Sequence, residues 1–320
     1  MRFKISIALI CAAGVAATAM LSPVAAQRRA VPQGLIGRWD LTVRTPDGGT
    51  YPSWLDIQLS GHSTLVGYFV GRGGSVRPVS EVKYEGEQFH FSIPKQWEQG
   101  PNDIKVEGRL SGGKLVGRYF DDHGKPFDWT AERAPELRPT REPVWGTSVE
   151  LFNGKDLSGW KTRNPNRPNG WVVENGLLRN QKPGNDLITE QQFQDFKLHV
   201  EFRYPRGSNS GIYLRGRYEA QIEDNYGKSP DSHYIGGVYG FLTPRVMAAK
   251  PAGEWQTMDI TLVGRIVTLV LNGEPVIERQ AIPGITGGAL DSNEGAPGPI
   301  MLQGDHGPID FRKVTLTPAR

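Results

Sequence analysis

The stretch MDITLVGRIVTLVLNGEPVI, residues 258–277, decides the fold class because three strands can be read from it in succession. It begins as a strand, a tight turn and a second strand, all rich in β-branched and apolar residues. Asn272-Gly273 comes next, and this dipeptide is the strongest short signal for a β-hairpin because both residues accept a positive φ. A third strand follows, so the stretch predicts consecutive antiparallel strands.

Strand signals continue on both sides of this stretch. FKLHVEFRY, residues 196–204, alternates strictly between an apolar face and a face of charged and polar residues. Residues 300–302 and 311–316 supply closing strands, and no stretch after Pro143 shows a sustained 3.6-residue period. These patterns predict an all-β domain over residues 145–318, arranged as a two-sheet antiparallel β-sandwich of the jelly-roll kind.

The N-terminal part, residues 33–133, carries a different β pattern. Three similar phrases recur, LIGRW (35–39), LVGYF (65–69) and LVGRY (115–119), and each is bounded by glycine-rich turns. Short strands of this kind predict an antiparallel β-meander that forms a small, barrel-like domain. GRGG, residues 71–74, has the composition of a phosphate cradle, but no helix is expected after it, so a hairpin turn is the favoured interpretation.

Two segments lie outside these domains. APELRPTREPV, residues 134–144, places three prolines among charges, which favours an extended, semi-stiff linker. Residues 1–26 have the positive start, apolar run and small-residue cleavage site of a secretory signal peptide. We therefore expect a secreted or periplasmic protein with no integral membrane segment once the signal is removed.

Cysteine content and charge exclude several classes of protein. The single cysteine, Cys11, lies in the expected signal peptide, so the mature chain is expected to have neither disulfides nor thiol chemistry. Loss of Arg2 and Lys4 with the signal lowers the formal net charge from +3 to +1. With no basic block and 40 glycines in 320 residues, the composition argues against a nucleic-acid partner.

The stretch NSGIYLRGRYEAQIEDN, residues 209–225, concentrates charge in what reads as two strands. If its aliphatic residues face the core, the period of two places the intervening residues on the opposite face. The residues predicted on that face are Tyr213, Arg215, Glu219, Gln221 and Glu223, with Asp224 joining them through a β-bulge. This row is either a solvated surface or a site for a polyhydroxylated ring, which amide and carboxylate oxygens and an aromatic face suit.

Eight phrases in order show that residues 145–318 resemble the 3-keto-disaccharide hydrolase domain family. The phrases are VELFNGKDLSGW (149–160), WVVENGLL (171–178), NSGIYLRG (209–216), YEAQIEDN (218–225), GGVYG (236–240), KPAGEWQTMDI (250–260), LNG (271–273) and GPIMLQGDHGPIDFRKV (298–314). The resemblance implies a concanavalin A-like lectin/glucanase fold. It also implies cleavage of glycosides that have already been oxidised to a ketone at C3.

The chemistry of a C3 ketone indicates what such a site needs. The ketone acidifies the C2 proton, so a base can remove it and form an enolate, after which the C1 leaving group departs by elimination. Water can then add back, which gives net hydrolysis. This route needs one base, an electrophile for the enolate oxygen and an acid for the leaving group. It does not need the paired carboxylates of direct glycoside hydrolysis.

We assign roles to the polar residues of these phrases as hypotheses. Glu219 is the leading carboxylate, as base or as acid, and His306 in the loop QGDHG is the histidine expected to transfer protons. Asp305 either orients that imidazole or holds a divalent metal, which leaves metal-assisted enolisation open. The remaining candidates are Arg215 and Lys250 for the enolate charge, Gln221 and Gln303 for sugar hydroxyls, and Tyr213, Asp224 and Tyr239 for further substrate contacts.

Two other classes of function remain open from the sequence. A non-catalytic, lectin-like carbohydrate-binding protein would use the same sandwich, because fold does not fix function. A scaffold protein would bind a partner through the N-terminal domain and would need an exposed apolar patch there. The sequence leaves the sugar, the linkage and the oligomeric state open.

Overall fold

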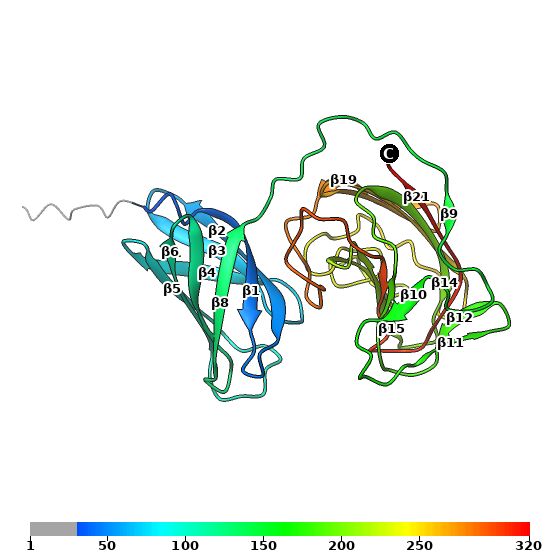
Figure 1. Ribbon diagram of the computed structural model, residues 1–320, viewed down its shortest axis with the longest axis horizontal. Coiled ribbons are helices and arrows are strands. Elements are labelled where there is room, and N and C mark those ends of the chain that lie inside the picture. Colours follow the sequence, from blue (N-terminus) through cyan, green and yellow to red (C-terminus); the bar gives the residue numbers. More distant parts are fainter. Residues whose placement is uncertain (1–30) are drawn as a thin grey trace, which may run out of the picture. The chain divides into compact units, whose positions relative to one another are not determined.

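The computed structural model describes residues 31–320, which form one compact unit built from strands β1 to β21 without a helix (Figure 1). The predicted all-β fold is therefore confirmed for this part of the chain. The predicted signal peptide, residues 1–26, lies outside the described residues. Over residues 31–320 there is no helix long and apolar enough to cross a membrane.

The first eight strands close into a barrel, because β1 pairs with both β2 and β8. Their bounds are β1 (Gly37–Arg44), β2 (Thr50–Ser60), β3 (Thr64–Val70), β4 (Arg77–Glu85), β5 (Gln88–Ile93), β6 (Ile104–Ser111), β7 (Lys114–Phe120) and β8 (Pro126–Arg133). The three recurrent phrases contribute to β1, β3 and β7, and GRGG lies in the β3–β4 connection, where no helix follows it. Position 117 of LVGRY requires glycine because any Cβ there would overlap Trp129 of the barrel core.

The remaining strands form two sheets. The five-stranded sheet runs in the order β10 (Trp160–Thr162), β13 (Leu187–Thr189), β20 (Met301–Leu302), β15 (Asn209–Leu214) and β16 (Tyr218–Glu223). The eight-stranded sheet runs β11 (Trp171–Glu174), β12 (Leu177–Asn180), β21 (Ile309–Pro318), β14 (Phe196–Arg203), β17 (Gln256–Val263), β18 (Ile266–Leu271) and β19 (Glu274–Ala281), with β9 (Val149–Glu150) paired to β21.

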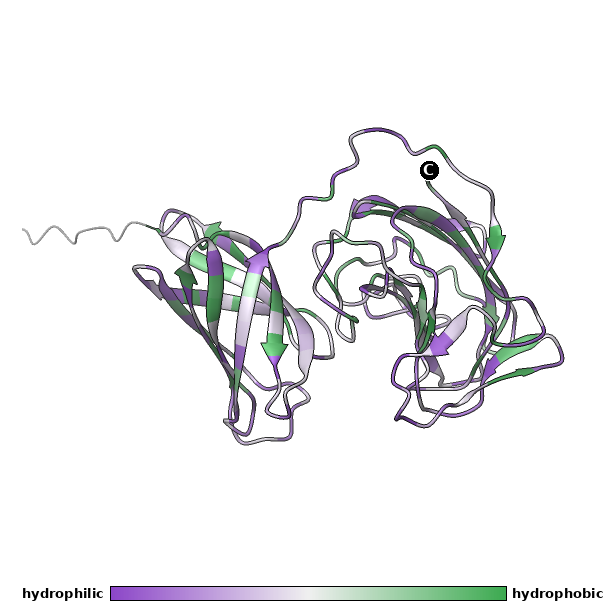
Figure 2. Cartoon of the chain, in the orientation of Figure 1, coloured by the Kyte–Doolittle hydropathy of each residue, from purple (hydrophilic) through white to green (hydrophobic). Residues whose placement is uncertain are grey.

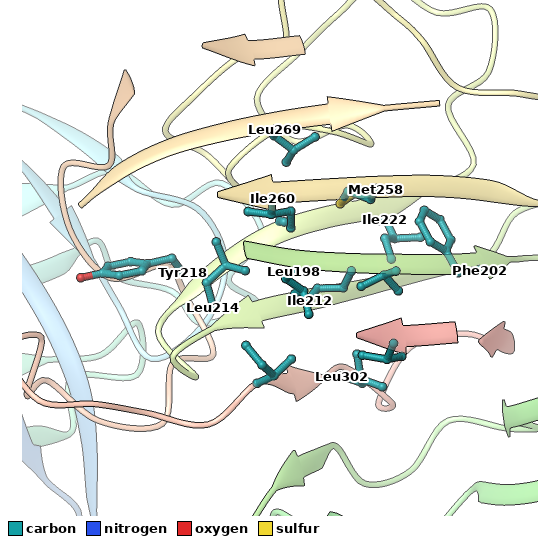
Figure 3. Packing of buried hydrophobic residues seen from close by; sticks show 14 of the residues in the cluster. Leu198, Phe202, Ile212, Leu214, Tyr218, Ile222, Met258, Ile260, Leu269 and Leu302 are labelled. Carbon is teal, nitrogen blue, oxygen red and sulfur yellow. The ribbon is translucent and has the colours of Figure 1, made fainter. Parts of the chain in front are cut away.

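The core of the sandwich is made by side chains that alternate along these strands, as the hydropathy colouring shows (Figure 2). In β14 every second residue is buried, as the sequence predicts. Figure 3 shows Leu198 and Phe202 of β14 in one cluster with Ile212 and Ile222 of the five-stranded sheet. The predicted hairpin at Asn272-Gly273 is confirmed between β18 and β19, with φ of 53° and 85°.

Residues 134–144 form no strand, and part of this segment is held against the sandwich. The backbone carbonyls of Pro135 and Leu137 accept hydrogen bonds from the side chain and the main-chain N–H of Arg265. Two barrel residues, Trp54 of β2 and Val70 of β3, are fully buried in the hydrophobic cluster of the sandwich. The barrel and the sandwich thus share packing within residues 31–320.

Candidate active site

The hairpin of β15 and β16 forms the floor of the candidate site. The two strands pair so that Tyr213 lies directly opposite Glu219. Ile212 and Ala220, their neighbours along the strands, are buried in the core between the sheets. Because successive side chains alternate between the two faces of a strand, Tyr213 and Glu219 lie side by side on the other face.

Arg215 does not join them, and the prediction that placed it on the face of Tyr213 is wrong. Arg215 lies in the turn after β15 with a φ of 54°, so the period of two ends before it. Its side chain is fully buried and donates to the carbonyl of Gly264 (2.7 Å) and to the hydroxyl oxygen of Tyr218 (3.3 Å). These contacts give Arg215 a structural role in the core, and its role toward an enolate stays a prediction.

Glu219 is held at one carboxyl oxygen and free at the other. Its Oε2 lies 2.9 Å from the hydroxyl of Tyr213, which also lies 2.8 Å from the carbonyl oxygen of Gly287. A hydroxyl has one proton to donate, so it can satisfy only one of these acceptors when Glu219 is ionised. When Glu219 is protonated, no carboxylate competes for the hydroxyl proton, and the hydroxyl can donate to the carbonyl of Gly287. Oε1 accepts no hydrogen bond from residues 31–320 and is the oxygen open to a ligand.

Burial raises the pKa of Glu219 to about 8, since an ionised carboxylate is disfavoured where water is excluded. The hydroxyl of Tyr213 and the charge of His306 lower this pKa, whereas the negative charges of Asp305 and Asp186 raise it. The side chain is only 3 % exposed. Glu219 is therefore mostly protonated at neutral pH, in agreement with the hydrogen-bond arrangement.

Asp305 and His306 form a second proton-transfer unit in the loop after β20. The Nδ1 atom of His306 lies 2.5 Å from Oδ1 of Asp305, and the His306 side chain is 52 % exposed. The hydrogen bond to Asp305 raises the pKa of His306, burial opposes this, and the negative charge of Glu219 adds to the rise. With Nδ1–H donated to Asp305, Nε2 is left to accept or release a proton.

The loop that carries Asp305 and His306 is fixed by residues that the sequence analysis did not single out. Asp186 accepts a hydrogen bond from the N–H of Gly304 (3.0 Å) and forms an ion pair with Arg163 (3.1 Å). Arg163 also donates to the carbonyls of Gly288 (2.9 Å) and Ala289 (3.0 Å). A single guanidinium thus ties the loop to the segment that contacts Tyr213.

Gln303 and Tyr239 lie near Glu219, as their assignment as substrate contacts requires. The main chain of Gln303 is tied to β15 at Gly211 and Ser210. Its Oε1 is buried without a hydrogen-bond partner, which makes it an acceptor available to a ligand hydroxyl. The N–H of Tyr239 donates to the carbonyl of Glu219 (3.0 Å), and the negative charge of Glu219 helps burial to raise the pKa of the Tyr239 phenol.

Gln221 and Asp224 are both used to hold the backbone. The amide of Gln221 donates to the carbonyl of His233 (3.1 Å), and its oxygen accepts from the N–H of Ile222 (3.0 Å). β16 ends at Glu223 without the predicted bulge, and Asp224 instead accepts from the N–H of Gly207 (2.8 Å). These contacts give both residues a role in local structure, and their contact with a sugar stays a prediction.

Lys250 lies in the loop before β17 and not with the proton-transfer groups. Its ammonium donates to the carbonyl of Trp255 (3.1 Å), and its N–H donates to Oε1 of Gln256 (2.9 Å). The side chain is exposed. The enolate contact expected of Lys250 stays a prediction.

Asp305 is committed to His306, and the structure offers no donor set around it for a metal. Across residues 31–320, no group of three or more His, Cys, Asp or Glu side chains is gathered as a metal site would require. The described residues show Asp305 in contact with His306, as the orienting role requires, and its metal-binding role stays a prediction.

The sequence of the sandwich identifies its family. Residues 147–317 match the model of the 3-keto-alpha-glucoside-1,2-lyase-like domain, and the chain belongs to this family. The resemblance found in the sequence is thereby confirmed. A 3-keto-disaccharide hydrolase of Bacteroides thetaiotaomicron is 25 % identical over 184 residues, which are 46 % of this chain and 63 % of that protein. The chain therefore spans less than two thirds of this relative.

Solved structures show similar sandwiches. A Parabacteroides distasonis protein assigned as a glycosyl hydrolase is 27 % identical with a TM-score of 0.46, over 57 % of this chain and 96 % of that one. A carbohydrate-binding module from Bacillus subtilis is 13 % identical with a TM-score of 0.34, over 49 % of this chain and 94 % of that one.

Proposed function

We propose that the chain cleaves the glycosidic bond of 3-keto-glycosides by removal of the C2 proton, elimination at C1 and subsequent addition of water. The observation that carries the proposal is a pair of proton-transfer groups close enough for their charges to act on each other: Glu219, with a pKa of about 8, and the His306–Asp305 unit. Membership of the 3-keto-alpha-glucoside-1,2-lyase-like family and the name of the Bacteroides relative support the substrate class.

The proton transfers assign a role to each group. Nε2 of neutral His306 takes the C2 proton, and the electron pair of the C2–H bond forms an enolate with the C3 carbonyl. When this pair returns, the C3 carbonyl re-forms, C1 and C2 become doubly bonded, and the C1–O bond breaks with its electrons on the leaving oxygen. Glu219 gives that oxygen a proton. No oxidation state changes, and addition of water across C1 and C2 yields the free 3-keto sugar.

Tyr213 would compensate for the charge that this step leaves on Glu219. Before the transfer its hydroxyl donates to the carbonyl of Gly287; afterwards it can turn to donate to Oε2 of the new carboxylate. Asp305 keeps the imidazole of His306 in the tautomer that exposes Nε2 as a base. The proton is delivered from Oε1 of Glu219, the carboxyl oxygen that does not face Tyr213, and the unpaired Oε1 of Gln303 is the acceptor available to the sugar.

The direct test is incubation of the protein with a 3-keto-glucoside that bears a chromogenic leaving group, with the parent glucoside in parallel. We expect release from the keto sugar alone, because only the ketone acidifies the C2 proton. The same assay with EDTA separates metal-independent enolisation from metal-assisted enolisation. Binding of both sugars without cleavage would contradict the proposal and would favour the lectin-like alternative.

The pH dependence of kcat/KM is expected to be bell-shaped. Activity should rise with pH as His306 loses its proton, above the ordinary range of histidine because Asp305 raises its pKa. Activity should fall as pH increases through about 8, because Glu219 then loses the proton that it must donate. Initial rates between about pH 5 and about pH 10 measure both limbs. A rate that stays constant through pH 8 would contradict the acid role of Glu219.

The site of action is a separate proposal. We propose export from the cytoplasm on the basis of the signal-peptide pattern in residues 1–26. Fractionation of expressing cells, with N-terminal sequencing of the mature chain, tests it. Recovery of the uncleaved chain in the cytoplasm would contradict it.

A further inference from the structure

We infer that the N-terminal barrel is a working part of the active site, because it sets the position of a wall segment, residues 286–289, that holds Glu219 and Tyr213. The inference depends on the proposed function for its catalytic meaning. The family match begins at residue 147, so it assigns no role to the barrel. The inference gives the barrel residues a positioning role and leaves the chemistry to the sandwich.

The wall segment contacts the catalytic hairpin directly. Oγ1 of Thr286 accepts a hydrogen bond from the N–H of Glu219 (3.0 Å). The carbonyl oxygen of Gly287 lies 2.8 Å from the hydroxyl of Tyr213, and the carbonyl of Gly288 accepts from Arg163. The segment thus fixes the backbone of Glu219 and the hydroxyl of Tyr213, which pairs with Oε2 of Glu219. It also binds Arg163, whose guanidinium anchors the loop of His306.

The other side of the wall segment rests on the β3–β4 connection of the barrel. The N–H of Gly288 donates to the carbonyl of Arg72 (3.2 Å). The backbone of Gly287 packs so closely on Gly74 that a Cβ at position 287 would overlap the Gly74 carbonyl oxygen. The absence of a side chain at position 287 is what lets two backbones meet here.

Trp54 of β2 makes a further contact between the barrel and the residues around the site. Its indole packs on Gly284, just before the wall segment, where a Cβ would overlap the ring. It also meets Phe241 edge-on, with ring centroids 5.5 Å apart. Phe241 follows Tyr239, whose N–H donates to the carbonyl of Glu219. Trp54 therefore supports the strand of Glu219 from two sides.

The physical reason for this arrangement is that the wall segment belongs to no sheet. Residues 283–298 form no strand, and the sandwich holds the segment at separate points, such as the N–H of Thr286 on the carbonyl of Arg217 and the N–H of Leu290 on the carbonyl of Gly216. A displacement of about 1 Å in groups that position a reacting centre can cost about 10²-fold in rate. The barrel supplies the packing that keeps the segment in place and keeps water from Glu219, whose other facing groups are Tyr213, His306, Asp305 and Asp186.

The test compares Gly287→Ala with Gly73→Ala in the full chain. The first introduces a Cβ against the Gly74 carbonyl, whereas a Cβ at position 73 meets nothing within 4 Å. Neither glycine has a positive φ, so backbone strain does not confuse the comparison. For Gly287→Ala we expect kcat to fall by about tenfold or more with KM changed much less, and Gly73→Ala to match the original protein.

The pH profile separates positioning from a general loss of folded protein. Displacement of the wall segment admits water to Glu219, so the limb near pH 8 should move to lower pH in Gly287→Ala and in Trp54→Ala. Trp54→Phe should recover most of the original profile. Unchanged kcat and an unchanged limb in both Gly287→Ala and Trp54→Ala would overturn the inference.

A second readout does not depend on turnover. Carbon-13 NMR titration of the glutamate carboxyl groups, with Glu219→Gln to assign the signal, reports the pKa of Glu219 in each variant. If no 3-keto-glycoside is cleaved by the original protein, the proposed function fails, yet this titration still tests the barrel. A Glu219 signal that titrates identically in the original protein and in Gly287→Ala would then overturn the positioning role.

Discussion

Replacement of Glu219 by glutamine is expected to lower kcat by about 10²–10⁴-fold on a 3-keto-disaccharide, the range typical of a lost general acid. Glutamine keeps the shape of the protonated side chain and can still hydrogen-bond to Tyr213, but it cannot protonate the departing oxygen. Because Glu219 is buried and mostly protonated at neutral pH, the substitution exchanges one neutral group for another, and the fold should be retained. Steady-state rates, with circular dichroism as the check on folding, measure the effect.

The leaving group identifies the step in which Glu219 acts. A nitrophenolate leaves without a proton, so for the nitrophenyl 3-keto-glucoside the loss in Glu219→Gln should shrink to about tenfold or less. His306→Asn is the matched control: removal of the C2 base should slow both substrates by similar factors. Equal losses for both substrates in Glu219→Gln would make Glu219 the base instead of the acid. Rates equal to those of the original protein would remove it from catalysis.

The sequence was sufficient to place Glu219 and Tyr213 on one face. Both lie within strands whose other face packs in the apolar core, and a slip of one residue would place Glu219 in that core instead of Ala220. Alternation with a period of two predicts side-chain direction reliably when one face of the strand lies in the core. For the same reason the alternation in β14 and the hairpin at Asn272-Gly273 could be predicted.

The same rule failed for residues at or beyond the ends of strands. Arg215 enters a turn with a positive φ, and Asp224 follows the last residue of β16. Once hydrogen bonding to the neighbouring strand ends, alternation no longer dictates direction, and the nearest carbonyl or N–H decides where a polar side chain goes. Lys250 lies in a loop where no periodicity applies at all.

Other parts of the site could not be found in the sequence by any local pattern. The hydrogen bond between Tyr213 and Gly287 joins residues 74 positions apart in the sequence, and the one between Asp186 and Gly304 joins residues 118 positions apart. Such pairings depend on how the strands order themselves in the sheet. The wall segment contributes backbone carbonyls, and Gly287 and Gly288 offer no side-chain chemistry to recognise. What identifies them is the packing of two backbones, which only the folded structure shows.

We expect Arg265→Met to lower the stability of the protein strongly. Arg265 and Glu294 form an ion pair at 2.6 Å with side chains 2 % and 0 % exposed. Arg265 also donates to the carbonyls of Pro283 (2.7 Å) and Pro135 (2.9 Å), and Glu294 accepts from the hydroxyl of Tyr218 (2.8 Å). Removal of the guanidinium leaves a buried carboxylate without its cation, which should cost about 3–5 kcal/mol in the free energy of unfolding.

Urea denaturation of Arg265→Met beside Arg245→Met measures this difference. Arg245 pairs with Glu274 at 3.0 Å, but both side chains are about half exposed, so its loss should cost less than about 1 kcal/mol. Addition of Glu294→Gln to Arg265→Met should recover part of the loss, because the double variant no longer buries an unpaired charge. Asp40 of the barrel lies near Glu294. Burial is the largest cause that raises the pKa of Asp40 to about 9, and the negative charge of Glu294 is the next. If Arg265→Met proved as harmless as Arg245→Met, water would have to reach Glu294, which would contradict the complete burial of this carboxylate.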